Sequence, residues 1–151
     1  MSASIVFAAG AQNGGQNSNG QLRYSENEQQ VTNQWRLNNG NWCYMGNDGS
    51  MARNMFQYDS CGLCYLDNNG YLYKAGGWIE NMENHNWCYL GTNGYALKNT
   101  WMKDSNGWCY LGDDCNCVIN GWAKDSNGWC YIGADGHWDG KTQVPEIPSS
   151  N

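Results

Sequence analysis

The sequence predicts an all-β protein, a solenoid built from about five β-hairpin repeats. The first observation is a Cys-Tyr pair that recurs at spacings of 21, 24, 21 and 21 residues. The five copies are Trp42-Cys43-Tyr44, Leu63-Cys64-Tyr65, Trp87-Cys88-Tyr89, Trp108-Cys109-Tyr110 and Trp129-Cys130-Tyr131. Self-similarity at a short fixed period is typical of a solenoid, in which one supersecondary unit stacks on copies of itself. The second observation is an Asn-Gly pair ahead of the last copy, which favours a tight hairpin turn between two aromatic segments.

The last repeat predicts how the side chains of one hairpin are arranged. If residues 125–128 form the loop, Trp122 lies opposite Tyr131 across the hairpin. Side chains alternate between the two faces of a strand. Trp122, Trp129 and Tyr131 then share one face, and Cys130 lies on the other. We therefore expect three aromatic rings on one side of each complete hairpin.

The other repeats keep this register to different degrees. Three of them carry the same aromatic positions, which are Trp35, Trp42 and Tyr44 in repeat one, Trp78, Trp87 and Tyr89 in repeat three, and Trp101, Trp108 and Tyr110 in repeat four. Repeat two is degraded, since Phe56 and Leu63 stand where Trp is expected and only Tyr65 remains. We expect one fewer ring in the second hairpin.

Composition limits the functions that the chain can have. It contains 9 Trp and 10 Tyr but only 2 Phe, and Leu, Ile and Val are few. Aromatic packing must therefore supply much of the buried apolar area, at roughly 150–250 Å² for each large ring. The formal net charge of −6 argues against a nucleic-acid partner, which would need a basic face. No run approaches the ~20 apolar residues that a membrane-spanning helix needs.

The chain is expected to divide into three segments. Residues 34–140 hold the repeats. Residues 1–33 include a Gly/Asn/Gln-rich stretch and are too few for a catalytic domain. We expect them to form an extended segment that anchors the repeats to a larger assembly. The first eleven residues lack a basic start and a long apolar run, so we expect no removed secretory signal. Residues 141–151 contain Pro145 and Pro148 and are expected to form an extended tail.

These repeats resemble the choline-binding, or cell-wall-binding, repeats of Gram-positive bacteria and their phages. The pattern of that family is Gly-Trp, a short polar loop, Trp-Tyr-Tyr, a Gly turn and a Met or Leu. Here Gly121-Trp122, Trp129-Cys130-Tyr131 and Gly136 follow it, and the resemblance covers the repeat region. The chain departs from the pattern consistently, because Cys replaces the middle aromatic in every copy. The resemblance implies a left-handed superhelix of β-hairpins.

The resemblance also implies aromatic cages that hold choline, each made by two rings of one repeat and a Tyr of the next. By position the cages would be Trp35, Trp42 and Tyr65; Trp78, Trp87 and Tyr110; and Trp101, Trp108 and Tyr131. Trp122 and Trp129 have no sixth repeat to close their cage, so Trp138 is expected to substitute. The degraded repeat would form a weak or empty cage. Ring faces hold a quaternary ammonium by roughly 0.5–2 kcal/mol per contact.

We therefore expect a non-catalytic protein that binds choline on cell-wall teichoic acid or a similar polymer. Several cages on one chain would gain by avidity on such a polymer. The expected location is extracellular or on a virion, for instance as a phage fibre or attachment protein. Further expected partners are a larger protein assembly, through residues 1–33, and other copies of this chain. No cofactor is expected.

Two other functions stay open. Related repeats stack the sugars of a glucan on the same rings. Alternatively, the repeats form a structural rod that binds no ligand, because the same Trp and Tyr residues can simply be the core of a chain so poor in aliphatic residues.

The eight cysteines form an even and dense set, which favours disulfides in an oxidising compartment. Cys61, Cys115 and Cys117 break the repeat pattern, so they are the candidates to pair with strand cysteines. A structural zinc site needs two ligand pairs of suitable spacing, but Cys64 of the Cys-x-x-Cys pair is already explained by the repeat and Cys-x-Cys is a poor zinc pair, so we expect no metal. His85 and His137 have no Ser or Cys partner at a recognisable spacing, so we expect no catalytic residue.

Overall fold

The computed structural model describes residues 15–16, 22–26 and 29–143 of the chain. All regular structure within these residues is β, which confirms the predicted fold class. The strands are β1 (Gly15–Gln16), β2 (Leu22–Arg23), β3 (Ser25–Glu26), β4 (Gln29–Gln30), β5 (Gln34–Asn38), β6 (Asn41–Met45), β7 (Met55–Tyr58), β8 (Leu63–Leu66), β9 (Gly77–Asn81), β10 (Asn86–Leu90), β11 (Thr100–Lys103), β12 (Trp108–Leu111), β13 (Gly121–Asp125) and β14 (Gly128–Ile132). The described part of the chain has no helix capable of crossing a bilayer.

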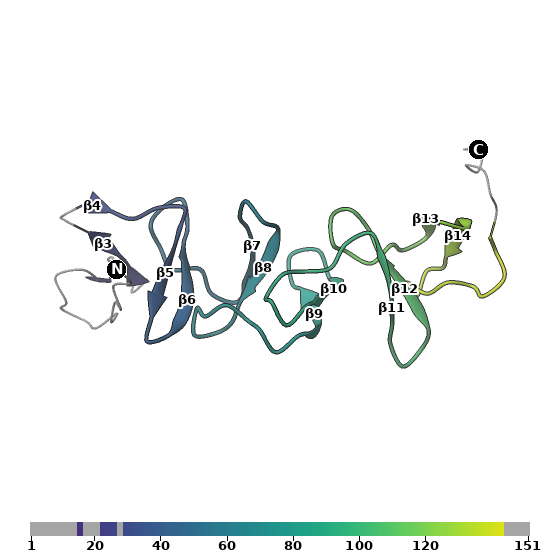
Figure 1. Cartoon of the computed structure of the whole chain (residues 1–151), viewed down its shortest axis with the longest axis horizontal. Coiled ribbons are helices and arrows are strands. Elements are labelled where there is room, and N and C mark those ends of the chain that lie inside the picture. Colours follow the sequence, from purple (N-terminus) through teal and green to yellow (C-terminus); the bar gives the residue numbers. More distant parts are fainter. Residues whose placement is uncertain (1–14, 17–21, 27–28, 144–151) are drawn as a thin grey trace. The chain divides into compact units, whose positions relative to one another are not determined.

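Each repeat is one two-stranded antiparallel hairpin, as Figure 1 shows for β5–β6, β7–β8, β9–β10, β11–β12 and β13–β14. In the last hairpin Trp122 pairs with Tyr131 and Lys124 pairs with Trp129, which is the predicted register. The equivalent pairs of the other hairpins are Trp35 with Tyr44, Phe56 with Tyr65, Trp78 with Tyr89, and Trp101 with Tyr110. The alternation of faces predicted from the sequence therefore holds in all five repeats.

A second turn follows each hairpin and returns the chain beside the second strand. Gly136 takes φ +80° in the last of these turns, a left-handed conformation that a residue without Cβ adopts freely. The returning segment makes two backbone contacts. Trp138 forms an isolated bridge with Ile132 of its own repeat, and its N–H donates to the carbonyl of Trp108 in the preceding repeat, 2.8 Å away. Repeats four and five are thus joined through this returning segment.

The chain divides into two compact units, residues 1–74 and 75–151. In the first unit Tyr24 and Val31 share a buried cluster with Cys43, Met45 and Met51. The N–H of Val31 also donates to the carbonyl of Tyr24, 2.8 Å away. Residues on both sides of β3–β4 are therefore part of the core of the first repeat. The predicted boundary at residue 33 stays a prediction, and most of the predicted anchor and tail lies outside the described residues.

In the second unit a buried cluster contains Cys109, Leu111 and Cys117, with Trp78 and Met102 packed against it. The middle cysteine of every repeat is buried, as expected for the face opposite the rings. Burial raises the pKa of the Cys88 thiol to about 12, since a thiolate would be poorly solvated there. These cysteines act as small apolar side chains. The expected disulfides are not found, and all eight cysteines are free thiols in this structure.

Candidate ligand pockets

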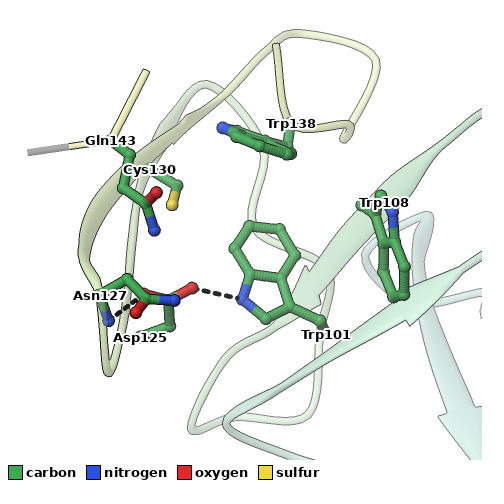
Figure 2. A pocket seen from close by; sticks show the side chains of 7 residues that line it. All are labelled: Trp101, Trp108, Asp125, Asn127, Cys130, Trp138 and Gln143. Atoms are coloured by element: carbon green, nitrogen blue, oxygen red, sulfur yellow. Dashed lines mark hydrogen bonds between the residues drawn. The ribbon is translucent and has the colours of Figure 1, made fainter. Parts of the chain in front are cut away.

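The second unit contains a pocket at the junction of repeats four and five, shown in Figure 2. We call it the Trp101 pocket, and its lining residues are Trp101, Trp108, Asp125, Asn127, Cys130, Trp138 and Gln143. Its volume is about 320 Å³. That value is near the lower end of the roughly 300–1,000 Å³ that small-molecule pockets have. Two of the predicted site residues, Trp101 and Trp108, are thus brought together in one pocket.

The indole of Trp101 is held on several sides. Its Nε1–H donates to Oδ2 of Asp125 over 3.1 Å. Tyr110 packs edge-on against it, with ring centroids 5.1 Å apart, and Trp138 packs at a tilt with centroids 6.2 Å apart. In Figure 2 Trp101 lies in the middle of the group, between Trp138 and Asp125, with Trp108 to one side. The ring is therefore fixed in place before any ligand arrives.

The carboxylate of Asp125 is placed by the loop of its own hairpin. Its Oδ1 accepts the N–H groups of Asn127 and Gly128 at 2.8 and 3.1 Å, which closes an Asx turn at the end of β13. The other oxygen is left to accept the indole N–H of Trp101. Asp59 and Asp104 begin the same kind of turn in repeats two and four. The Asx turn therefore fixes the negatively charged carboxylate of Asp125 in the pocket.

Trp108 and Trp138 complete the aromatic walls. Trp108 is 45% exposed, and the Nζ of Lys103 lies 5.9 Å from its ring centroid. The indole N–H of Trp138 donates to the carbonyl of Thr142, which holds the second ring. Trp138 was expected to close a cage with Trp122 and Trp129. The structure places it in the Trp101 pocket instead, because its returning segment is bonded to repeat four.

The predicted third wall of this cage, Tyr131, is not among the lining residues. Its ring packs edge-on against Trp122, with centroids 5.4 Å apart. The pocket wall from repeat five is Cys130. The reason is the strand alternation itself: Tyr131 shares a face with Trp122, and the opposite face of the hairpin meets Trp101. The residue that lines the pocket is the middle one of the repeat, which is Cys in every copy. The predicted register already put this Cys on the face opposite Tyr131.

A second pocket, at the junction of repeats three and four, has the same plan. We call it the Trp78 pocket, and its volume is about 390 Å³. Its lining residues are Trp78, Asn86, Trp87, Asp104, Asn106, Cys109, Cys117, Ile119, Asp135, Gly136 and His137. Tyr110, the third wall predicted here, is again absent from the lining and packs on Trp101. Cys117 stands where the Trp101 pocket has Trp138.

The remaining predicted site residues lie on the same framework. In the first unit Trp35 repeats the arrangement of Trp101, since its Nε1–H donates to Oδ2 of Asp59 over 2.9 Å. Trp42 is 42% exposed, and Tyr65 packs against Phe56 with ring centroids 5.1 Å apart. In the last repeat Trp129 has the Nζ of Lys124 5.7 Å from its ring centroid.

No protein-family model matches the chain, and no curated protein sequence matches it either. Solved structures do match. Choline binding protein F from Streptococcus pneumoniae aligns with a TM-score of 0.54 and 28% identity, over 85% of this chain and 42% of that protein. The repeats have the choline-binding fold. The resemblance inferred from the sequence is thereby confirmed.

Two further structures support the choline-binding repeat fold. CbpJ from Streptococcus pneumoniae has a TM-score of 0.55 and 22% identity, over 83% of this chain and 41% of that one. A multimodular pneumococcal cell wall endolysin from phage Cp-1, solved with choline, has a TM-score of 0.53 and 22% identity. That match covers 98% of this chain and 43% of the endolysin. The chain thus spans about two fifths of the length of the proteins that it resembles.

Proposed function

We propose that this chain is a non-catalytic module that binds the choline groups of a bacterial cell-wall polymer. The Trp101 pocket carries the proposal. Three indoles, from Trp101, Trp108 and Trp138, surround a cavity that also holds the carboxylate of Asp125. Choline binding protein F, with 28% identity, has also been solved with a peptidoglycan analogue, which supports a cell-wall polymer as partner.

The chemistry of the pocket suits a quaternary ammonium group. Such a cation has no N–H donor, so ring faces and a nearby negative charge must hold it. Asp125 supplies the charge, and its hydrogen bonds fix the carboxylate in position. The ring of Trp108 already attracts the ammonium group of Lys103. Each ring face contributes roughly 0.5–2 kcal/mol, so one pocket alone would bind weakly.

Repetition of the pocket plan supports a polymeric ligand. The Trp–Asp hydrogen bond of the Trp101 pocket recurs between Trp35 and Asp59 in the first unit. A chain with several such positions gains by avidity when the ligand repeats along a polymer. This supports a decorated wall polymer over free choline as the biological target.

Calorimetry of the full chain tests the proposal. We expect choline to bind, and 3,3-dimethyl-1-butanol, its uncharged isostere, to bind at least about tenfold more weakly because it lacks the cation. Trp108→Leu should remove one site while leaving the circular dichroism spectrum unchanged, since this ring is half-exposed. Equal binding of the two compounds would contradict the cation role. Retention on dextran in place of choline-agarose would favour a glucan ligand, and no binding to either would favour a structural rod.

We also propose that the module acts outside the cell within a larger assembly, such as a phage attachment fibre, to which residues 1–33 attach. Tyr24 and Val31 belong to the core of the first repeat, so a deletion that tests this attachment must stop before residue 22. Removing residues 1–21 should abolish incorporation into the particle and leave choline binding intact. Normal incorporation of the truncated chain would contradict the attachment role.

A further inference from the structure

We infer that the Trp78 pocket binds a divalent metal ion of the zinc class, with Asp104, Cys109 and His137 as ligands. This site is separate from the proposed choline pocket, and neither inference depends on the other. The three side chains come from different parts of repeats four and five, and each offers one donor atom to a common point. Those donor atoms all lie within 4.8 Å of one another.

Two of the three distances between the donors are close to those around a bound ion, and the third is no more than 4.8 Å. Nε2 of His137 lies 3.0 Å from Oδ2 of Asp104, and Sγ of Cys109 lies 3.7 Å from the same oxygen. Ligand bonds of about 2.0–2.3 Å place the donors of a tetrahedral zinc site about 3.3–3.8 Å apart. The cluster therefore needs only a slight opening between His137 and Asp104 to admit the ion.

Neighbouring groups hold the carboxylate ligand in the required orientation. Oδ1 of Asp104 accepts the N–H groups of Asn106 and Gly107 at 2.7 and 3.0 Å, and both carboxylate oxygens lie 3.0 Å from Nε2 of His137. Gly107 also makes room for the imidazole, because a Cβ at this position would lie 3.3 Å from Cδ2 of His137. The loop thus fixes the carboxylate and allows the ring to approach it closely.

The histidine has the supporting partner that is usual for a metal ligand. A metal-bound imidazole generally gives its second N–H to a carboxylate or carbonyl. Here Nδ1 of His137 is buried and has no hydrogen-bond partner within the described residues, and Oδ2 of Asp135 lies 3.4 Å from it. A small rotation of the exposed Asp135 carboxylate would complete this pair. Nδ1 is thus directed toward Asp135, which leaves Nε2 to face the cluster.

A fourth donor is close at hand. Cys117 lines the same pocket, and its thiol shares a hydrogen bond with that of Cys109. A divalent cation would stabilise their thiolates, which are the softer donors that zinc-class ions prefer. Asp104, Cys109 and His137 supply three ligands, and either a shift of the Cys117 side chain toward them or a bound water would supply the fourth.

The equivalent pocket provides a natural control. In the Trp101 pocket Asp125, Cys130 and Trp138 stand at the positions of Asp104, Cys109 and Cys117. The lining of that pocket contains no histidine. The two pockets therefore share the hairpin framework and differ in the groups that would make one of them a metal site. Variants at Cys109 and at Cys130 change the same position of the repeat in the two pockets.

Cobalt(II) titration of the full chain, kept reduced, tests the site. We expect one ion per chain, with a thiolate-to-cobalt charge-transfer band and the visible bands of tetrahedral cobalt, all displaced by zinc. Cys109→Ala and His137→Gln should each abolish these bands, and Cys130→Ala should leave them unchanged. Asp135→Asn, at an exposed side chain, should weaken cobalt affinity by about tenfold.

Three outcomes would overturn the site. They are the absence of stoichiometric cobalt bands, bands that persist at full strength in both Cys109→Ala and His137→Gln, and equal loss in Cys130→Ala. Circular dichroism of each variant separates loss of a ligand from loss of the fold. The Asp135→Asn variant keeps the test decisive if a buried variant fails to fold. Choline calorimetry at the Trp101 pocket should not depend on cobalt, so the two proposals fail separately.

Discussion

The Trp101 and Trp78 pockets are two versions of one plan. Each has two Trp residues from one hairpin, and the Asp and the middle Cys from the next. They differ in what the returning segments add. His137 belongs to the Trp78 pocket and the adjacent Trp138 to the Trp101 pocket. Because successive side chains of an extended segment point to opposite sides, two neighbouring residues give two pockets different chemistry.

The comparison shows that the repeat framework and the pocket chemistry are set by different residues. The framework depends on turn residues and on the hairpin register, which both pockets share. The chemistry depends on the few positions that the repeats do not share, chiefly residues 117, 137 and 138. A repeat protein of this kind can therefore change one pocket without disturbing the next one.

The largest expected effect comes from Trp101→Ala. The indole contacts Tyr110 and Trp138 and donates to Asp125, so its loss should lower the free energy of unfolding by about 3 kcal/mol and remove choline binding at this pocket. Urea unfolding of the full chain measures the change. Trp122→Ala is the matched control, since no hairpin follows that of Trp122 within the described residues, and we expect it to lower the free energy of unfolding by about 1 kcal/mol. Equal losses would show that the pocket contacts of Trp101 add no stability.

Cys130→Tyr restores the aromatic that the family pattern has at this position, and it should place a fourth ring in the Trp101 pocket. We expect choline affinity to rise by about tenfold, in line with one added ring contact. The same change in the other pocket, Cys109→Tyr, should destabilise the chain by about 1–3 kcal/mol more than Cys130→Tyr does, because the ring would also displace His137 and Asp104. Calorimetry and thermal melts distinguish the two. Identical behaviour would contradict the difference between the pockets.

Asp125→Asn tests the charge of the Trp101 pocket while keeping an acceptor for the turn. Removing the negative charge should weaken choline binding by about fivefold, the effect of about 1 kcal/mol of attraction in a partly solvated site. Asp67→Asn is the control, since Oδ1 of Asp67 accepts the N–H groups of Asn69 and Tyr71 in a turn of the first unit and Asp67 does not line the pocket. A loss of affinity in both variants would assign the effect to turn stability.

The smallest effect expected concerns the reactivity of the cysteines. Cys61 is exposed and the other seven are buried, so a thiol reagent should modify one thiol of the folded, reduced chain quickly and the rest slowly. Burial also raises the pKa of Cys43 to about 11, which disfavours its reactive thiolate. Stopped-flow detection with a chromogenic disulfide measures the two phases. Rapid modification of Cys130 would show that the Trp101 pocket opens more widely than its burial indicates.

Much of the local structure could be predicted from the sequence. The pairing of Trp122 with Tyr131 and the loop between them follow from strand alternation and turn residues, which act over fewer than ten positions. The family resemblance rests on the same short-range pattern. The core role of Tyr24 and Val31 was missed, because a single buried pair beside a polar stretch has no period to detect.

The composition of the pockets was decided by the stacking of one hairpin on the next. Alternation along a strand determines which residues share a face, but it does not determine which neighbour that face meets. The family resemblance implied Tyr131 as a wall of the cage, and the pocket beside Trp101 is lined by Cys130 and Trp138. The contact of His137 with Asp104 spans 33 residues and arises only when the returning segment of repeat five reaches back to repeat four. Short-range patterning determined the hairpins, and the long-range backbone bonds between them decided which side chains meet.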